Sequence, residues 1–234
     1  MQICKVQICK YAKAHTSRPG RKHQNTKNKN TKYDPLLFAR LQPFFSEHGF
    51  RADAATGIFR HSHPDGWLTV GVSEIPQTVG QLVELQLGIR HTLVEEIIYP
   101  FALGLSSGGA AHTLWVSQGQ IDGQVDRQEW VRDEADEVLV ARQWQQWMLE
   151  KGLAWLDIYR QPVWLDRLYN DEPETAARWQ PDPFQRCLRA VALAYLAQRI
   201  DFRSIVQHGK RDLAKAETAP ELLLRLDALV SALP

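Results

Sequence analysis

The sequence predicts an α+β protein with an antiparallel sheet of four or five strands, packed on one side by helices, and a helical C-terminal extension. One helical pattern precedes a block of short extended segments that are joined by turn residues. One of these segments, 81–91, is apolar on one face and mixed on the other, as in a sheet covered on one side only. From about Asp133 onward the apolar residues recur at helical spacing. The order helix, strands, helices is typical of α+β proteins.

The folded part is predicted to begin with a helix near residue 34. Asp34 suits an N-cap and Pro35 suits the first helical position. An apolar stripe at helical spacing follows, and Gly49 is expected to end the helix. Pro43 falls inside this pattern and is expected to kink or break the helix. The residues of the stripe are Leu37, Leu41, Phe44 and Phe45.

The strand block follows this helix. Extended segments are predicted at 50–53, 58–62, 67–73, 81–91 and 111–118, with turn chemistry in "AATG" and "HPDG". In 81–91, Val83, Leu85, Leu87 and Ile89 share one face. Thr92 and Glu95 resemble a capping box that opens a short helix, which Pro100 should interrupt.

The rest of the chain is predicted to be helical. The acidic run "DEADEV" at 133–138 suits the positive end of a helix, and the apolar stripe behind it includes Trp144, Met148 and Leu149. A second helical segment covers 153–169 and is divided by Pro162, and 170–183 has the composition of a linker. Asp182 and Pro183 start a strongly periodic helix, and two weaker helices are predicted near 203–217 and 220–232.

The charge distribution divides the chain further. Residues 1–33 contain nine Lys or Arg and no Asp or Glu, whereas the remaining 201 residues contain 19 basic and 27 acidic side chains, a balance of −8. We therefore expect a basic, disordered tail at 1–33, an α+β domain at 34–170 and a helical extension at 171–234 that packs on it. Three interpretations of the tail are open: it binds nucleic acid through phosphate contacts, it is an amphipathic membrane-surface segment, or it is an extension with no role in the fold, which is the favoured interpretation.

The composition also bears on the compartment. No segment approaches the roughly 20 apolar residues needed to cross a bilayer, and the N-terminus lacks the apolar stretch of a secretory signal. The cysteines are Cys4, Cys9 and Cys187, an odd number without a C-x-x-C pair. We expect a cytoplasmic protein without a disulfide framework and without a cofactor, and a buried structural thiol at Cys187.

Several local patterns together resemble a group of small bacterial α+β domains of unknown function. They are the pair Gly49-Phe50, the strand "GIFRH" at 57–61, the Asp65-Gly66 turn and the strand "LQLGIR" at 85–90. The resemblance covers about residues 36–150. Such domains have no established active-site residues, so the resemblance implies a fold and no chemistry. Some toxin-immunity proteins share this style of domain, which is an analogy only.

The segment "FRHSHPDGW" is the strongest candidate for chemistry. His61 and His63 are two residues apart on one strand, so both imidazoles can face one metal ion, with a third ligand from Asp65, His91 or His112. However, His63-Pro64-Asp65-Gly66 is also a good turn. The turn is the favoured interpretation, and a small metal-dependent hydrolase using His61 and His63 is the alternative.

Other catalytic signatures are absent from the sequence. There is no H-E-x-x-H, P-loop or G-x-S-x-G, and "GLSSGGA" at 104–110 is interpreted as a flexible connection. We therefore expect a non-enzymatic protein-interaction domain, of the kind found in toxin immunity, whose acidic body suits a basic protein partner. The expected contact residues are Trp130, Asp133, Glu134, Asp136 and Glu137.

Overall fold

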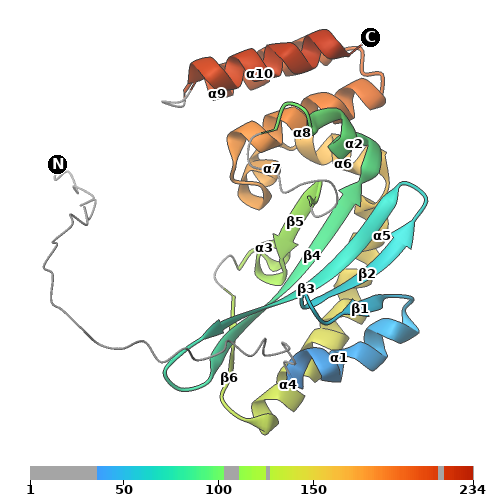
Figure 1. Cartoon of the computed structure of the whole chain (residues 1–234), viewed down its shortest axis with the longest axis vertical. Helices are drawn as coiled ribbons and strands as arrows, with labels where there is room; N and C mark the ends of the chain where they lie inside the picture. The colour runs from blue at the N-terminus through green and yellow to red at the C-terminus, as the bar shows by residue number, and fades with distance from the viewer. Residues whose placement is uncertain (1–35, 103–110, 125–126, 216–218, 234) are drawn as a thin grey trace, which may run out of the picture. The chain divides into compact units, whose positions relative to one another are not determined.

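The computed structural model describes residues 36–102, 111–124, 127–215 and 219–233 (Figure 1). Contacts divide the chain into two units, Met1–Lys32 and Tyr33–Pro234, and every described residue belongs to the second. The predictions for the basic tail, for the Asp34-Pro35 helix start and for the connection at 104–110 lie outside the described residues.

The centre of the fold is an antiparallel sheet, which confirms the predicted α+β class. The strands occur in the order β1-β2-β3-β4-β5, and β6 pairs with the same side of β4 as β5 does, nearer the beginning of β4. Every pairing is antiparallel. The strands are β1 (Arg51–Asp53), β2 (Ile58–His63), β3 (Gly66–Pro76), β4 (Gln81–His91), β5 (Leu114–Ser117) and β6 (Glu129–Val131).

Alternation along the strands gives the sheet one apolar face. Phe59, Val70, Leu87 and Val116 are consecutive partners across four strands, and each is fully buried. The predicted alternation in 81–91 is confirmed, because Val83, Leu85, Leu87 and Ile89 are all buried whereas Leu82, Glu84 and Gln86 on the other face are only partly so. This apolar face forms the core of the sheet.

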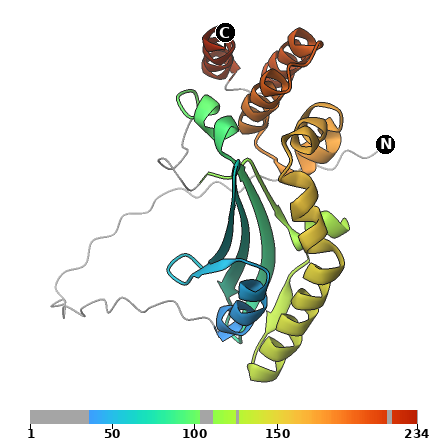
Figure 2. The ribbon, with the colours of Figure 1, turned by 90° about the vertical axis from the view of Figure 1, so that its right-hand side faces the viewer.

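A small set of helices covers the apolar face (Figure 2). Phe38 and Phe45 of α1 (Leu36–Glu47) stack on Phe59, with ring centroids 4.2 and 4.5 Å apart. Pro43 was expected to kink or break this helix, and the break is wrong: α1 continues through Pro43, which is exposed. Beside α1 run α4 (Glu134–Trp147), the π-helical turn η1 (Met148–Gly152) and α5 (Leu153–Tyr159), which follow one another without a break.

The π turn changes which residues face the sheet. Met148 is fully buried, but Leu149, which the predicted stripe placed inward, is 57% exposed. Trp155 and Leu156 are buried about two turns after Met148. A π turn holds one more residue than an α-helical turn, so it rotates the residues that follow it about the helix axis. The predicted stripe was wrong at Leu149 because it assumed a regular 3.6-residue period.

The remaining helices pack around α8, beyond one end of the sheet (Figure 1). A buried ion pair joins α8 to α2: Arg189 donates through Nε and Nη2 to the Glu95 carboxylate, at 2.9 and 3.1 Å. The Tyr169 hydroxyl donates to the Thr113 carbonyl at 2.5 Å. The helices of this group are α2 (Thr92–Ile98), α6 (Pro162–Asn170), α7 (Pro173–Trp179), α8 (Pro183–Leu196), α9 (Phe202–Leu213) and α10 (Ala219–Ala232), whereas the short α3 (Gln118–Asp122) lies against β4 and β5.

Helix starts were predicted with mixed success. The Asp182 carboxylate accepts hydrogen bonds from the amides of Phe184 and Gln185, which confirms the predicted cap of α8. The predicted capping box at Thr92 is wrong, because α2 has no side-chain cap and Glu95 is held by Arg189 instead. A capping box occurs at Ser117 of α3. The predicted linker at 170–183 contains the short helix α7.

Candidate functional site

The predicted histidine site divides between the two faces of the sheet. By register, His61, His63 and His91 lie on the helix-covered face, as expected for His61 and His63, whereas Nε2 of His112 lies 3.1 Å from Oγ1 of Thr69 on the other face. Among the described residues, no three His, Cys, Asp or Glu side chains lie close enough together to hold one metal ion. The metal alternative therefore lacks a third ligand in this part of the chain.

The segment from His63 to Gly66 behaves as a turn. Nδ1 of His63 accepts from the Asp65 amide at 3.3 Å, and the Asp65 carbonyl accepts from the Thr92 amide at 2.7 Å. Burial lowers the pKa of His63 and of His91, and the positive charge of Arg160 adds to the effect on His63. The two imidazoles are therefore neutral at pH 7, and they lie at the end of the β2–β3 hairpin.

The predicted acidic contact residues are already engaged within the fold. Asp133 caps α4 by accepting from the Asp136 amide at 2.9 Å. Asp136 pairs with Arg132 at 2.9 Å, and Arg40 of α1 pairs with Glu134 and Glu137 at 2.6 and 3.2 Å. These carboxylates thus hold α4 to α1 and to the preceding strand. Trp130, predicted to lie beside them, is on β6 opposite Leu82, with 49% of its surface exposed.

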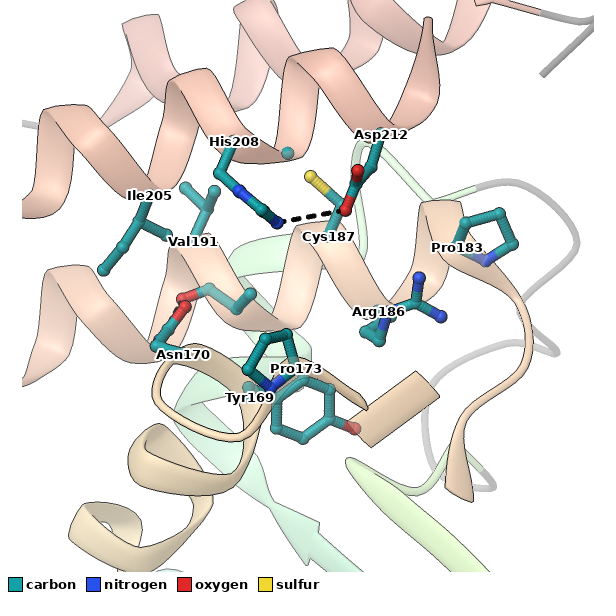
Figure 3. Close-up of a pocket in the computed structure, with 12 residues that line it drawn as sticks. Tyr169, Asn170, Pro173, Pro183, Arg186, Cys187, Val191, Ile205, His208 and Asp212 are labelled. Atoms are coloured by element: carbon teal, nitrogen blue, oxygen red, sulfur yellow. Dashed lines mark hydrogen bonds and ion pairs between the residues drawn. The ribbon is translucent and has the colours of Figure 1, made fainter. Parts of the chain in front are cut away.

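A small cavity lies among α6, α7, α8 and α9 (Figure 3). Its volume is about 120 Å³. Pockets for drug-sized ligands are typically about 300–1,000 Å³, so this cavity is too small for such a ligand. It is lined by Tyr169, Asn170, Pro173, Pro183, Arg186, Cys187, Ala190, Val191, Ile205, His208, Gly209 and Asp212.

The cavity contains the residue types of a thiol catalyst, but in the wrong electrostatic state. Nε2 of His208 lies 3.2 Å from the Asp212 carboxylate, and Cys187 lies near both (Figure 3). Burial raises the pKa of the Cys187 thiol to about 12. A nucleophilic cysteine needs a lowered pKa, because the thiolate is the reactive form. Cys187 is instead buried against Gly209, as expected for a structural thiol.

The second face of the sheet offers a larger surface. Figure 2 shows α4 and α5 along one side of the sheet, while no described helix runs along the other side. We call this second side the open face. By register it carries Arg51, Asp53, Ile58, Arg60, Ser62, Trp67, Thr69, Gly71, Ser73, Ile75, Leu82, Glu84, Gln86, Gly88, Arg90, Trp115, Ser117 and Trp130.

One end of the open face is positively charged. The guanidinium carbons of Arg60 and Arg90 lie 5.0 and 4.8 Å from the centroid of the Trp67 ring. Arg51 is directly opposite Arg60 in the β1–β2 register, an arrangement of like charges that destabilises a sheet. We call Arg51, Arg60 and Arg90 the arginine cluster. None of the three forms an ion pair with a carboxylate in the part of the chain that the structure describes.

Trp115 lies flat beside the arginine cluster. A Cβ atom added to Gly88 would lie 2.3 Å from the Trp115 ring, and one added to Gly71 would lie 2.9 Å from it, so the indole covers both glycines. His112 packs against Trp115 with ring centroids 4.5 Å apart. Burial lowers the pKa of His112 to about 4, and the nearby charges of Arg60 and Arg90 act in the same direction. His112 is therefore neutral at pH 7.

The other end of the open face is apolar. Ile75, Leu82 and Trp130 are consecutive register partners on β3, β4 and β6. Ile75 is 44% exposed, Trp130 49%, and Val79 in the adjoining β3–β4 turn 67%. We call Ile75, Val79, Leu82 and Trp130 the apolar end. Between it and the arginine cluster lie the smaller polar residues Ser73 and Gln86, with Glu84.

From the sequence, Trp130 was predicted as a contact residue, but the arginine cluster and Trp115 were not. The alternation of β2 and β4 does contain a signal, since Arg60 and Arg90 occupy the face opposite to the apolar residues. What the alternation does not contain is the register that places both arginines beside Trp67.

Comparisons with known proteins found no counterpart for this chain. No protein-family model, no curated protein and no solved structure matches it. None of the helices within the described ranges is long and apolar enough to span a membrane.

Proposed function

We propose that the folded unit is a non-enzymatic protein-interaction domain whose contact surface is the open face of the sheet. The observation that carries this proposal is a sheet face that no described helix covers, with exposed apolar side chains at one end and unpaired arginines at the other. An immunity role, in which the partner is a toxin, is one case of this proposal.

The residue types of the open face support binding. Tryptophan and arginine are enriched among the residues that dominate the energy of protein interfaces. Trp130 and Ile75 together leave nearly half of each side chain in water, although both project from a rigid sheet. Such side chains lose little conformational freedom when a partner covers them.

The acidic run at 133–137 is a weaker candidate for the contact surface. Arg40 and Arg132 already neutralise three of its carboxylates, and Asp133 is occupied as a helix cap. A partner that bound there would first have to displace these contacts. Of the predicted contact residues, Trp130 therefore stays in the proposed contact surface. The four acidic residues are replaced by the open face.

The test compares three purified proteins: the wild type, Trp130→Ala, and Leu149→Ala as a control. Leu149 is 57% exposed on η1, on the helical side of the molecule. Proteins retained from a lysate of the source cells would be quantified for each, and the strongest candidate would then be purified and titrated against all three by calorimetry. We expect Trp130→Ala to weaken binding about 30-fold, the effect of losing a central interface residue, and Leu149→Ala to leave it unchanged.

The opposite pattern would overturn the proposal. A purified partner that binds the wild type and Trp130→Ala equally, but loses affinity for Leu149→Ala, would place the contact surface on the helices. Circular dichroism of each variant would establish that the changes in affinity do not arise from unfolding.

A further inference from the structure

We propose that the arginine cluster is a carboxylate-binding site, so that the partner presents a segment bearing Asp or Glu side chains to Arg51 and Arg60, beside the buried Arg90. This inference rests on the proposed function and specifies the chemistry of the partner. It reverses the charge expected of the partner, because the acidic composition of the body suggested a basic partner.

The lack of ion pairs in the cluster is the first observation behind this inference. Acidic residues outnumber basic ones by 27 to 19 from residue 34 onward, yet only seven of the sixteen arginines there form ion pairs among the described residues. The cluster gathers three of the other nine on one face of the sheet. Arg199 alone holds three carboxylates, those of Asp166, Asp171 and Asp201. Ion pairs are also made by Arg40, Arg127, Arg132, Arg160, Arg189 and Arg225.

The acids on the open face do not compensate the cluster. Asp53 accepts a hydrogen bond from the Ala55 amide at 3.1 Å within its own turn. Glu84 accepts from Gln86 at 2.9 Å and lies six residues from Arg90, about 20 Å along β4. The positive charge at this end of the sheet is therefore left for an external anion.

The cluster is also organised for binding. Arg90 is only 7% exposed, and it is fixed by stacking on Trp67 and by donating from Nη1 to the Ala111 carbonyl at 2.9 Å. Nε of Arg60, Nε of Arg90 and Nε1 of Trp67 are shielded from solvent and have no acceptor among the described residues, so they are not the atoms that would meet an external ligand. The accessible side chains of the cluster are Arg51, which is exposed, and Arg60, which is partly exposed. Guanidinium groups only donate, so the site calls for a ligand that supplies acceptors.

A protein segment fits this surface better than a nucleic acid does. The cluster contains three arginines and no lysine, within a part of the chain whose balance of −8 opposes a long polyanion. The Trp67 ring already contacts two guanidinium groups, so it is not free to stack on a base. The apolar end offers nothing to a phosphate backbone but suits aliphatic or aromatic side chains.

The length of the face sets the spacing within the partner. Trp67 and Ile75 are eight residues apart on β3, about 26 Å. An extended partner segment would place its carboxylates about eight residues from its apolar side chains, and a helical one about 17 residues from them.

The experiment uses the full chain labelled with 15N at its tryptophan indoles and hexaglutamate, capped at both ends, as the probe. We expect the indole signals of Trp67 and Trp115 to shift with hexaglutamate while that of the buried Trp144 stays fixed. We expect Arg60→Gln to raise the midpoint of the titration at least fivefold. The matched control is Arg142→Gln, which removes one exposed arginine from α4. It should leave the midpoint unchanged.

Any of four outcomes would overturn the inference. The first three are the absence of any indole shift, an equal effect of Arg60→Gln and Arg142→Gln, and a ten-nucleotide thymidine oligomer that binds more tightly than hexaglutamate through Arg60. Acetate at the same carboxylate concentration separates a multivalent acidic segment from a free small anion, and an equal shift with acetate would also overturn it.

The two proposals can fail separately. A purified partner that depends on Trp130 but binds Arg60→Gln as tightly as the wild type would leave the open face as the contact surface and remove the acidic segment. If hexaglutamate binds at the arginine cluster but the partner binds Trp130→Ala as tightly as the wild type, the carboxylate site stands and the proposed contact surface does not.

Discussion

The buried ion pair between α2 and α8 gives the strongest stability prediction. Glu95 and Arg189 expose 1% and 2% of their side chains, and they share two hydrogen bonds of 2.9 and 3.1 Å. Replacing Glu95 with Leu would leave the guanidinium of Arg189 charged, buried and without its partner. Even in the intact pair, Nη1 of Arg189 has no hydrogen-bond partner within the part of the chain that the structure describes. The fold therefore depends on the carboxylate to keep this charge inside.

The size of the effect follows from the burial. Removing one partner of a buried pair costs about 3–5 kcal/mol, because the other charge stays desolvated. With a urea dependence of about 2–3 kcal/mol per molar, Glu95→Leu should lower the midpoint of unfolding by about 1.5 M. Arg189→Met should have a similar effect. The double variant replaces both charges with apolar groups and should lie within about 2 kcal/mol of the wild type.

Urea denaturation followed by far-ultraviolet circular dichroism measures all four proteins. The reasoning would be refuted if each single variant cost less than about 1 kcal/mol, because the isolated charge would then be solvated. It would be refuted equally if the double variant lost the sum of the two single effects, because the loss would then come from packing and not from an unpaired charge.

Three further predictions concern pH, backbone geometry and capping. The folded pKa of His112, about 4, lies below the ordinary value of 6.5, so stability should be lost as the pH falls from 6.5 to 4, by on the order of 3 kcal/mol. Urea midpoints of the wild type should show this loss, and those of His112→Gln should show a smaller one. Both glycines have a positive φ, but Gly66→Ala should lower the thermal midpoint far more than Gly123→Ala, because its Cβ would lie 1.9 Å from the Arg90 carbonyl oxygen whereas a Cβ at Gly123 meets no described atom within 4 Å. Calorimetry would contradict this if the two midpoints fell equally. Asp133→Ala should cost about 1 kcal/mol in urea unfolding through loss of the α4 cap, and an unchanged midpoint would show that the cap contributes nothing.

The sequence predicted the fold wherever one local pattern dominated. Segment 81–91 alternates over eleven residues, and Asp182-Pro183 is a strong helix start, so both were placed correctly. Strand β6 was missed because three residues are too short to show a period, and it exists only through pairing with β4. Helix α7 was missed because its turn-forming composition concealed it.

The candidate site was harder to predict because it depends on distant pairings. Arg40 and Glu134 are 94 residues apart, and only the folded chain shows that this contact uses up part of the acidic run. The converse holds for the arginine cluster. Arg60 and Arg90 look like ordinary surface residues in the sequence, and the register of β2, β3 and β4 makes them neighbours of one tryptophan.

The π turn η1 has a consequence for how this chain tolerates changes in length. A π turn is an α-helical turn with one residue inserted, so deleting one residue from η1 would restore a regular helix and leave Trp155 and Leu156 on the face that meets the sheet. Gly152 leaves room for the Met148 side chain in this turn, since a Cβ at residue 152 would lie 2.4 Å from Sδ of Met148. Homologues that lack one residue at this point should carry their downstream tryptophan one position earlier, which makes 148–152 the natural place for a single-residue gap inside an otherwise ungapped helix.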